Sequence, residues 1–463
     1  MSSPATALEW DAAFDERVER ARQTLADAGV EHCFATWADI HGRSKAKFVP
    51  VDRFETLARG SEAYTAQAFE GMGEIGPHAP DQVAVPDLDS LTICPWDRRL
   101  AWMASDLYWQ GAPYEYCSRT ILKSQIAAAA EQGYAMMLGI EPEFYVLRET
   151  EDGRLEPLSA GDTGPCWAYD VEKTLDAMPL LDALAKHVAE LGWQMHSFDH
   201  EGGHGQFELD FGFTDVLTMC DRFTFLRLML KEVAKRFGAF ATFMPKPFAS
   251  DFRSGSHYNM SLVGLESGEN LMTDPDDPAG AGFSPVAYGF VGGLLAHSSS
   301  LLAVSCPTVN SYKGFVTGGI DPTGLARDMS WAPVSATYGD NNRSSMLRFP
   351  NGRACVENRT PDMTHNPYWA AAIHLGAGLE GVIDATDPGA PANVNLYEEQ
   401  PGERVAFPSS LHEAVRAFEA DELTARVFGD GPKAEFVAVK MREWDEYNGH
   451  ISQWEHDRYL RFF

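Results

Sequence analysis

Polar and apolar side chains alternate along four short segments of the chain, and each segment gathers its polar groups on one face. These segments are residues 137–147, 201–211, 257–262 and 354–359. Because successive side chains of a strand point to opposite faces, this alternation predicts β-strands with one apolar and one polar face. The segments are far apart in sequence, so any site that they share depends on the fold.

The first segment carries two carboxylates on one face. Glu141 and Glu143 point to one side, while Ile140, Phe144 and Val146 point to the other. Two carboxylates on an otherwise apolar strand repel each other and lose hydration, so a nearby positive charge must compensate. A divalent cation supplies that charge. An edge strand with a solvated face is the alternative for this segment taken alone.

The other three segments add further potential ligands. The candidate metal ligands are Glu141, Glu143, Glu201, Glu208, His257 and Glu357. Five carboxylates and one imidazole are too many for one ion but suit two or three, and oxygen-rich ligation favours Mg²⁺ or Mn²⁺ over zinc. A core histidine is the usual alternative for His257, but Asn259 and Ser261 on the same face are polar, which favours a ligand.

The remaining pattern predicts helices between these strands. Residues 11–29 are typical of a helix and residues 32–38 of a short strand. A helix over 119–132, capped by Ser118, follows a domain boundary near 111–113. Longer helices are predicted at residues 179–191, 215–237, 285–306 and 367–383. The pattern indicates an α+β fold in which helices cover one side of a largely antiparallel sheet.

Charge and cysteine content narrow the class of partner. The 463 residues include 37 Lys and Arg against 67 Asp and Glu, a formal net charge of −30. This acidity argues against nucleic acid or an anionic membrane surface as the partner. Seven scattered cysteines without a Cys-x-x-Cys pair favour a reducing, cytoplasmic setting. Residues 286–306 are fairly apolar, but His297 and three serines interrupt them, which predicts a buried helix rather than a membrane span.

The polar segments resemble those of glutamine synthetase and its relatives, the glutamate–amine ligases. The matching motifs are Glu141-Pro-Glu143, Glu201 with Gly205-Gln-Phe-Glu208, Ser254-Gly-Ser-His257, Asn310-Ser-Tyr-Lys313, Asn342-Arg-Ser344, and Glu357-Asn-Arg359 followed by Asn366-Pro-Tyr368. They occur in the family's order between about residues 110 and 385. Each motif alone is weak, whereas the ordered set is specific.

The resemblance implies a division of the chain and an assembly. A small N-terminal β-grasp domain is expected at residues 1–111, and a large catalytic domain with a curved antiparallel sheet covered by helices at residues 112–463. The family forms stacked hexameric rings, so a homododecamer is expected, with sites between the N-terminal domain of one subunit and the catalytic domain of the next. Glu70 falls where the family's N-terminal loop reaches across, and it is a candidate for binding the cation of the amine.

The resemblance also assigns the metal ligands to two groups. One group, near the substrate carboxylate, consists of Glu143, Glu201 and Glu208. The other group would hold the cation that bridges the phosphates of ATP, and it consists of Glu141, His257 and Glu357.

Roles for the remaining polar residues follow from the same resemblance. Arg343 and Arg348 would bind the phosphates, and Arg359 the phosphoryl group or the α-carboxylate. The residues expected to flank the substrates are Asn259 and Ser261 at the nucleotide and Gly255 at the amino acid. Surface ion pairing is the alternative for the arginines, and it fits Arg353 best.

Two departures from the family's pattern affect the amino-acid and amine ends of the site. Ammonia-using members carry an arginine that binds the amino-acid carboxylate where this chain has Gly314, and Arg327 could take over that role. The family's flap glutamate, which helps to bind and deprotonate ammonium, aligns with Trp331. An indole in place of a carboxylate removes an ammonium anchor and adds apolar surface.

The sequence therefore predicts an ATP-dependent glutamate–amine ligase that forms a γ-glutamyl amide through a γ-glutamyl phosphate. A small alkylamine is favoured over ammonia as the nitrogen donor. The alternatives are a glutamine synthetase that uses ammonia and a non-catalytic homologue that senses nitrogen metabolites or scaffolds a complex. The presence of all six candidate ligands argues against the non-catalytic homologue.

Overall fold

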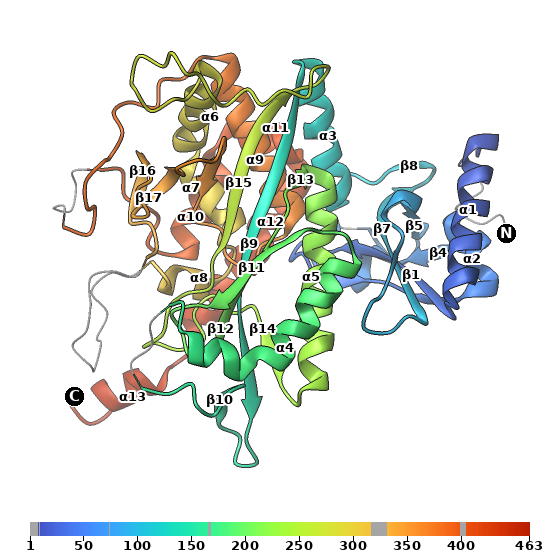
Figure 1. Cartoon of the computed structure of the whole chain (residues 1–463), viewed down its shortest axis with the longest axis horizontal. Coiled ribbons are helices and arrows are strands. Elements are labelled where there is room, and N and C mark those ends of the chain that lie inside the picture. Colours follow the sequence, from blue (N-terminus) through green and yellow to red (C-terminus); the bar gives the residue numbers. More distant parts are fainter. Residues whose placement is uncertain (1–7, 9, 74, 165–167, 316–330, 399–403) are drawn as a thin grey trace.

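The computed structural model describes residues 8, 10–73, 75–164, 168–315, 331–398 and 404–463. Its strands form two separate sheets (Figure 1). The N-terminal sheet has the order β2 (Ser44–Lys45), β1 (His32–Ala38), β7 (Leu100–Trp109), β5 (Gln82–Pro86), β4 (Glu62–Tyr64), with β3 (Phe48–Pro50) on β1 and β6 (Thr92–Ile93) and β8 (Ala112–Pro113) on β7. β1 and β7 run parallel, and the other neighbouring strands of this sheet are antiparallel.

The second sheet is the larger one, and its long central strands cross the middle of Figure 1. Its order is β11 (Met195–His200), β12 (Gln206–Phe211), β9 (Tyr134–Glu149), β15 (Ser256–Gly264), β18 (Val356–Asn358), β17 (Ser345–Phe349), β16 (Ser335–Asp340), with β10 (Leu155–Pro157), β13 (Thr214–Asp215) and β14 (Phe240–Thr242) on β9. Among the described strands of this sheet, only β16 and β17 pair in parallel. The predicted, largely antiparallel sheet is confirmed.

Helices pack on both sheets. They are α1 (Ala12–Ala28), α2 (Phe54–Ala58), α3 (Ser118–Glu131), α4 (Val171–Glu190), α5 (Val216–Arg236), α6 (Pro285–Ala296), α7 (Ser298–Ser305), α8 (Val309–Lys313), α9 (Pro367–Ile383), α10 (Leu411–Ala420), α11 (Glu422–Phe428), α12 (Asp430–Gly449) and α13 (Gln453–Tyr459). α3 and α5 lie against β9, and α9 packs on α3, α5 and α6. α1 and α2 lie at the outer edge of the N-terminal sheet (Figure 1).

Several predicted elements agree with the structure. The helix predicted at residues 11–29 is α1, which begins after Asp11, whose carboxylate accepts a hydrogen bond from the amide of Phe14 at 2.8 Å. It ends at Gly29, whose φ of 71° is adopted most easily by a residue without Cβ. The strand predicted at residues 32–38 is β1, and the last of the long predicted helices is α9.

Three helix predictions are wrong in detail. Ser118 does not cap α3, because it lies inside the first turn and its Oγ donates to the carbonyl of Ala38 at 3.2 Å. α4 begins well before Pro179, which lies in the helix interior. The helix predicted at residues 285–306 is broken at His297 into α6 and α7, which are mostly buried. No single helix in the described part of the chain is long and apolar enough to span a membrane; the α6–α7 pair meets that test only as one unit, bent by 75°.

The central strand β9 separates the core from the polar face of the larger sheet. Ile140, Phe144 and Val146 are at most 2% exposed and belong to the main hydrophobic core. Glu141 and Glu143 leave the opposite face of the same strand, as the alternation predicts. Burial of the apolar face therefore fixes the direction of both carboxylates, because a slip of one residue would put them into the core.

Candidate active site

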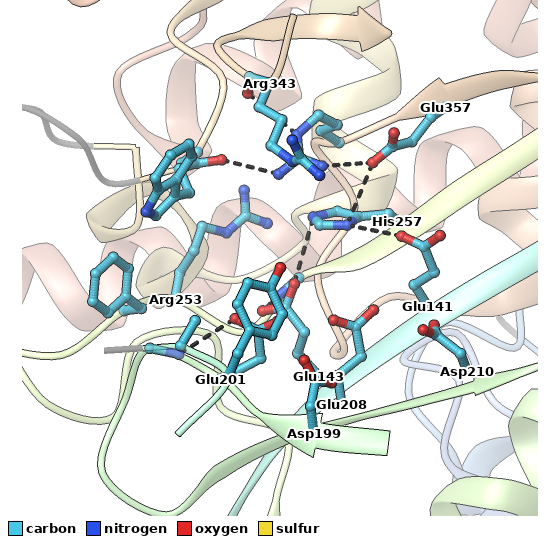
Figure 2. A pocket seen from close by; sticks show the side chains of 18 of the residues that line it. Glu141, Glu143, Asp199, Glu201, Glu208, Asp210, Arg253, His257, Arg343 and Glu357 are labelled. Atoms are coloured by element: carbon cyan, nitrogen blue, oxygen red, sulfur yellow. Dashed lines mark hydrogen bonds and ion pairs between the residues drawn. The ribbon is translucent and has the colours of Figure 1, made fainter. Parts of the chain in front are cut away.

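Neighbouring strands of the larger sheet bring the predicted ligands to one place. The register sets Glu143 opposite Glu208, Glu141 opposite His257, and Asn259 opposite Glu357. Directly opposed residues of antiparallel strands have Cβ atoms about 5 Å apart, so these polar groups share one patch. A cavity of about 690 Å³ lies over this patch (Figure 2).

The acidic side chains form two clusters in this cavity. Glu141, His257 and Glu357 make up one, and Asp199, Glu201 and Glu208 the other; within each cluster the potential ligand atoms lie within 4.8 Å of one another. The first cluster is the group expected at the ATP phosphates. The second contains Glu201 and Glu208 as expected, with Asp199 in place of Glu143, which lines the same cavity outside both clusters.

His257 stands between the carboxylates (Figure 2). Its Nδ1 lies 3.4 Å from Oε2 of Glu141 and 3.7 Å from Oε1 of Glu357, and its Nε2 lies 3.5 Å from Oε1 of Glu143. The ring therefore faces three carboxylates and is not a histidine enclosed by apolar side chains.

Burial and mutual repulsion perturb the pKa values of these acids in different directions. Burial raises the pKa of Glu143 to about 6 against the attraction of His257, and the charge of Glu201 adds to the rise. Burial, followed by the charges of Glu201 and Asp210, raises the pKa of Asp199 to about 7. Burial also opposes ionisation of Glu141, but His257 and Arg353 outweigh it and hold the pKa of this carboxyl below its usual value.

This arrangement fits hard divalent cations. Raised pKa values mark carboxylates that lack compensating positive charge, as Glu143 and Asp199 do. Ions such as Mg²⁺ and Mn²⁺ bind oxygen ligands at about 2 Å, so donors less than about 5 Å apart can share one ion. Both clusters meet that condition, and carboxylates dominate both, as these ions prefer.

Arginines border the opposite side of the cavity. Arg348 and Arg359 each donate through Nη1 to Glu357, at 2.6 Å and 2.5 Å. Arg359 also donates to the carbonyl of Trp331 at 3.2 Å. Arg343 lines the cavity with an exposed side chain. The structure thus brings the three predicted phosphate-binding arginines to one cavity, and two of them share one carboxylate.

Arg353 is the arginine that surface ion pairing fits best, and the structure does give it an ion pair, but with a carboxylate of the cavity. Its Nη1 donates to Oε1 of Glu141 at 2.8 Å, and its side chain lines the cavity although 45% of it is exposed. β18 follows directly after the turn that holds Arg353, so the guanidinium reaches back over the ligand strand β9.

The residues expected to contact substrates lie at different distances from the cavity. Gly255 lines it and donates its amide to Oε2 of Glu143 at 2.8 Å; a Cβ on this residue would lie 2.7 Å from both Glu143 Oε1 and His257 Nε2. Asn259 donates to Oε1 of Glu141 at 3.0 Å. Ser261 is buried two residues further along β15 and is not one of the described residues that line the cavity.

Of the residues expected at the amine end, one lines the cavity, one does not, and one lies outside the described part of the chain. Trp331 lines the cavity and remains 49% exposed. Arg327 lies outside the described residues. Glu70 is not among the described residues that line the cavity of this chain; it pairs with His41 at 3.0 Å and with Arg442.

Sequence reasoning missed two residues of the site. Asp199 precedes Glu201 by two positions, and the alternation of Ser197 and Asp199 along β11, continued by Glu201 just after it, was a signal that could have found it. Arg253 lies just before β15 and is only 7% exposed. A single arginine in a loop-like stretch gave no comparable signal.

Comparison with known proteins places this geometry in a family. Residues 115–459 match the family described as "Glutamine synthetase, catalytic domain". A glutamate–methylamine ligase of Methyloversatilis universalis is 39% identical over 450 residues, which cover 96% of this chain and 99% of that protein. A glutamine synthetase of Rhizobium meliloti is 32% identical over 438 residues, which cover 94% of this chain and 97% of that protein.

Solved structures agree. A structure described as a GmaS/ADP complex, conformation 1, superposes with a TM-score of 0.88 at 33% identity and covers 95% of this chain and 99% of that chain. Apo GmaS without ligand superposes with a TM-score of 0.86 at 33% identity over the same shares of the two chains. The sequence match, the shared fold and the two acidic clusters lead to one conclusion: the chain belongs to the glutamine synthetase family of ATP-dependent ligases.

Proposed function

We propose that this protein is a glutamate–amine ligase that uses ATP to join the γ-carboxylate of glutamate to a small primary alkylamine such as methylamine. The observation that carries the proposal is the single cavity in which two acidic clusters face a group of arginines. The similarity to a glutamate–methylamine ligase over nearly the whole length of both chains supports the same activity.

In the proposed reaction, a γ-carboxylate oxygen of glutamate attacks the terminal phosphorus of ATP, and ADP leaves. The amine nitrogen then attacks the acyl carbon of the γ-glutamyl phosphate, loses a proton, and inorganic phosphate leaves. The divalent cations, when bound, offset the negative charge of the phosphates and of the attacking carboxylate. Two or three such ions suit the two clusters.

Different residues of the cavity are proposed to hold the two ions, the phosphates and the substrates. The ligands proposed for the ion beside the acid substrate are Glu143, Glu201 and Glu208, joined by Asp199, and those for the ion at the ATP phosphates are Glu141, His257 and Glu357. Arg343, Arg348 and Arg359 would hold the phosphoryl oxygens, for which the forked guanidinium is suited. Asn259 and Ser261 are proposed to flank the nucleotide, and Gly255 leaves room for the amino acid.

The amine end supports an alkylamine over ammonia. Trp331 presents an indole to the cavity at the mouth, where its backbone carbonyl accepts from Arg359. Apolar surface there favours an alkyl group, while ammonia gains nothing from it. A glutamine synthetase that uses ammonia is the second candidate, because proteins of that name are also similar over most of the chain.

Phosphate release from ATP tests the proposal. The purified protein with Mg²⁺ and ATP should release phosphate only when glutamate and an amine are both present, and mass spectrometry should find the γ-glutamyl amide. Methylamine should give a higher kcat/KM than ammonium after correction for the free-base fraction. A higher value for ammonium would assign the protein to ammonia-using glutamine synthetase, and no release with any amine would favour a sensor or scaffold.

The proposal extends to domains, assembly and compartment. The N-terminal sheet has hydrophobic clusters of its own, around Leu25 and around Trp37, which support a separate β-grasp domain at residues 1–111 before a catalytic domain at 112–463. A homododecamer of stacked rings would bring Glu70 of one subunit to the site of the next. The described cysteines are all free, which supports a reducing cytoplasm.

A further inference from the structure

Arg253 is a buried arginine of the cavity whose guanidinium is only partly used. Its Nη2 donates to the carbonyls of Thr360 at 2.8 Å and Pro361 at 3.2 Å. Nε and Nη1 are buried and have no hydrogen-bond partner among the residues that the structure describes. Unpaired donors of a buried charged group are costly, so a ligand that accepts from them would be bound strongly.

The guanidinium of Arg253 has an aromatic ring over one face and two acidic side chains near it. The centre of the Phe315 ring lies 4.5 Å from the guanidinium carbon of Arg253. The positive charge of Arg253 acts on the side chains of Asp362 and Cys306 against the rise in pKa that burial causes. By distance and angle, neither of these side chains accepts a hydrogen bond from Nε or Nη1. Figure 2 shows the guanidinium of Arg253 in the cavity, between Glu201 and Arg343.

The other buried arginines of the site already have carboxylate partners. Arg348 and Arg359 both pair with Glu357, and the half-exposed Arg353 pairs with Glu141. Arg253, in contrast, has no ion pair within 4.0 Å among the described residues. Its Nε and Nη1 are left without a hydrogen-bond acceptor in the same part of the chain.

Gly314 leaves the space that Arg253 occupies. A Cβ on Gly314 would lie 3.0 Å from both Cβ and Cδ of Arg253 and 3.2 Å from the carbonyl oxygen of Ser311. Any longer side chain at position 314 would therefore compete with Arg253 for one place. Only one of the two positions can therefore carry an arginine at this wall of the cavity, and in this chain it is position 253.

Arg253 is tied to the end of the cavity where Glu143 lies. The side-chain amide of Gln206 donates to Oε2 of Glu143 at 3.2 Å and to the carbonyl of Arg253 at 2.9 Å. The amide of Gly255, two residues after Arg253, donates to the same carboxylate at 2.8 Å. Arg348 and Arg359 pair instead with Glu357, and Arg359 also donates to the backbone carbonyl of Arg343.

From this position we propose that Arg253 binds the α-carboxylate of the amino-acid substrate and so selects a 2-amino dicarboxylic acid over an acid that lacks the second carboxylate. This proposal rests on the proposed glutamate–amine ligase activity. The carboxylate would accept from Nη1, which is left free, while Nη2 remains bound to the chain; Nε–H points to the other side of the guanidinium. Arg253 is thus a specificity-determining residue and not a ligand of the nucleotide.

Substitution of Arg253 combined with a shortened substrate tests this. Glutamate is compared with 4-aminobutyrate, which is glutamate without its α-carboxylate. In Arg253→Gln, kcat/KM for glutamate should fall about 10- to 150-fold, the range for loss of a charged hydrogen bond, while the value for 4-aminobutyrate and the KM for ATP stay within about twofold. The preference for glutamate over 4-aminobutyrate should therefore collapse. Arg253→Lys, which keeps the charge but not the fork, should fall between the two.

A double variant tests the shared space. Arg253→Gly alone should lose glutamate selectivity, and Arg253→Gly with Gly314→Arg should regain part of it, because the second arginine enters the same place. Circular dichroism and Tm of each variant separate loss of binding from loss of folding, and Arg253→Lys is the fallback if the other variants unfold.

Other results would overturn the proposal. A rise in KM for ATP with unchanged selectivity would make Arg253 a phosphate ligand, and an equal loss for both acids would make its role structural. If the wild-type protein shows no ATP-dependent reaction with glutamate and any amine, the proposed function fails instead. The glutamate-induced rise in Tm, present in wild type and absent in Arg253→Gln, then tests the binding role on its own.

Discussion

Arg348 donates through Nη1 to Oε2 of Glu357 at 2.6 Å, and the Glu357 side chain is fully buried. Arg359 donates to the other oxygen of the same carboxylate at 2.5 Å. Burial would raise the pKa of Glu357, but the charges of Arg359 and His257 outweigh it and lower the pKa. A carboxylate proposed to bind a cation is therefore also the anion that holds two arginines in place.

Glu357 and Glu143 should differ in their effect on stability, because Glu357 is paired with two arginines and Glu143 lies among other acids. Glu357→Gln leaves two buried arginines without their anion and should lower the free energy of unfolding in EDTA by about 3 kcal/mol. Glu143→Gln removes a carboxylate whose neighbours repel it, so stability in EDTA should change by less than about 1 kcal/mol. Both variants should lose ligase activity. Urea unfolding with and without EDTA measures this, and equal destabilisation by both changes would contradict the prediction.

Metal binding should depend on pH through the acids with raised pKa values. The pKa values of Glu143 and Asp199 are about 6 and about 7 in the folded chain, above their usual values. Their contribution to the stability of the metal-free protein is thus present at low pH and is lost as pH rises through 6 and 7. A bound cation favours the ionised forms and reverses this loss.

The expected result is that the rise in Tm caused by Mn²⁺, relative to EDTA, grows between about pH 5 and pH 8. The difference between Tm with Mn²⁺ and Tm with EDTA excludes the effect of groups that ionise alike in both buffers. One such group is the buried His365, whose pKa is lowered to about 3. Differential scanning calorimetry measures this. A difference that stays constant across the range would show that these acids do not bind the ion.

Asp199 should contribute to the ion beside Glu201 and Glu208. Asp199→Asn should weaken Mn²⁺ binding at that cluster by about tenfold or more, because an amide is a neutral and weaker ligand. Asp210→Asn is the matched control, since this carboxylate lines the same cavity but lies outside both clusters. Titration followed by electron paramagnetic resonance gives the affinities. An equal effect of the two changes would remove Asp199 from the ligand set.

Trp331 should favour alkylamines. Each methylene buried against the indole contributes roughly 0.8 kcal/mol, or about fourfold in affinity, and ammonia gains none of it. Trp331→Glu should shift the ratio of kcat/KM for methylamine and ammonium towards ammonium, because a carboxylate attracts the small cation. Trp331→Phe is the control and should keep the alkylamine preference. If both variants lose all amines alike, the indole serves only to close the cavity.

Assembly should complete the site. Light scattering should give an oligomer of stacked rings, and a fully active monomer would contradict the proposed role of Glu70. Co-expression of equal amounts of Glu70→Gln and Glu143→Gln should restore about a quarter of wild-type activity if each site takes one residue from each of two subunits. No recovery would place Glu70 in a structural ion pair with Arg442.

The strands and most of the candidate ligands can be predicted from local sequence pattern. Alternation with a period of two is a property of the chain, so the face of Glu141 and Glu143 could be predicted once Ile140 and Phe144 were assigned to the core. Helix α9 could be predicted likewise, because Asn366 and Pro367 mark its start. Such signals are local, and they do not need the rest of the molecule.

Which side chains meet depends on the packing of the whole chain. The place of Arg353 against Glu141 and that of Arg253 beside Gly314 join residues distant in sequence, and a single arginine carries no periodicity to mark it. The break at His297 also depends on tertiary contacts, since this ring bonds to Glu380 and Asp421 from other helices. Local pattern therefore sets the faces of strands and helices, whereas packing sets the partners of each charge.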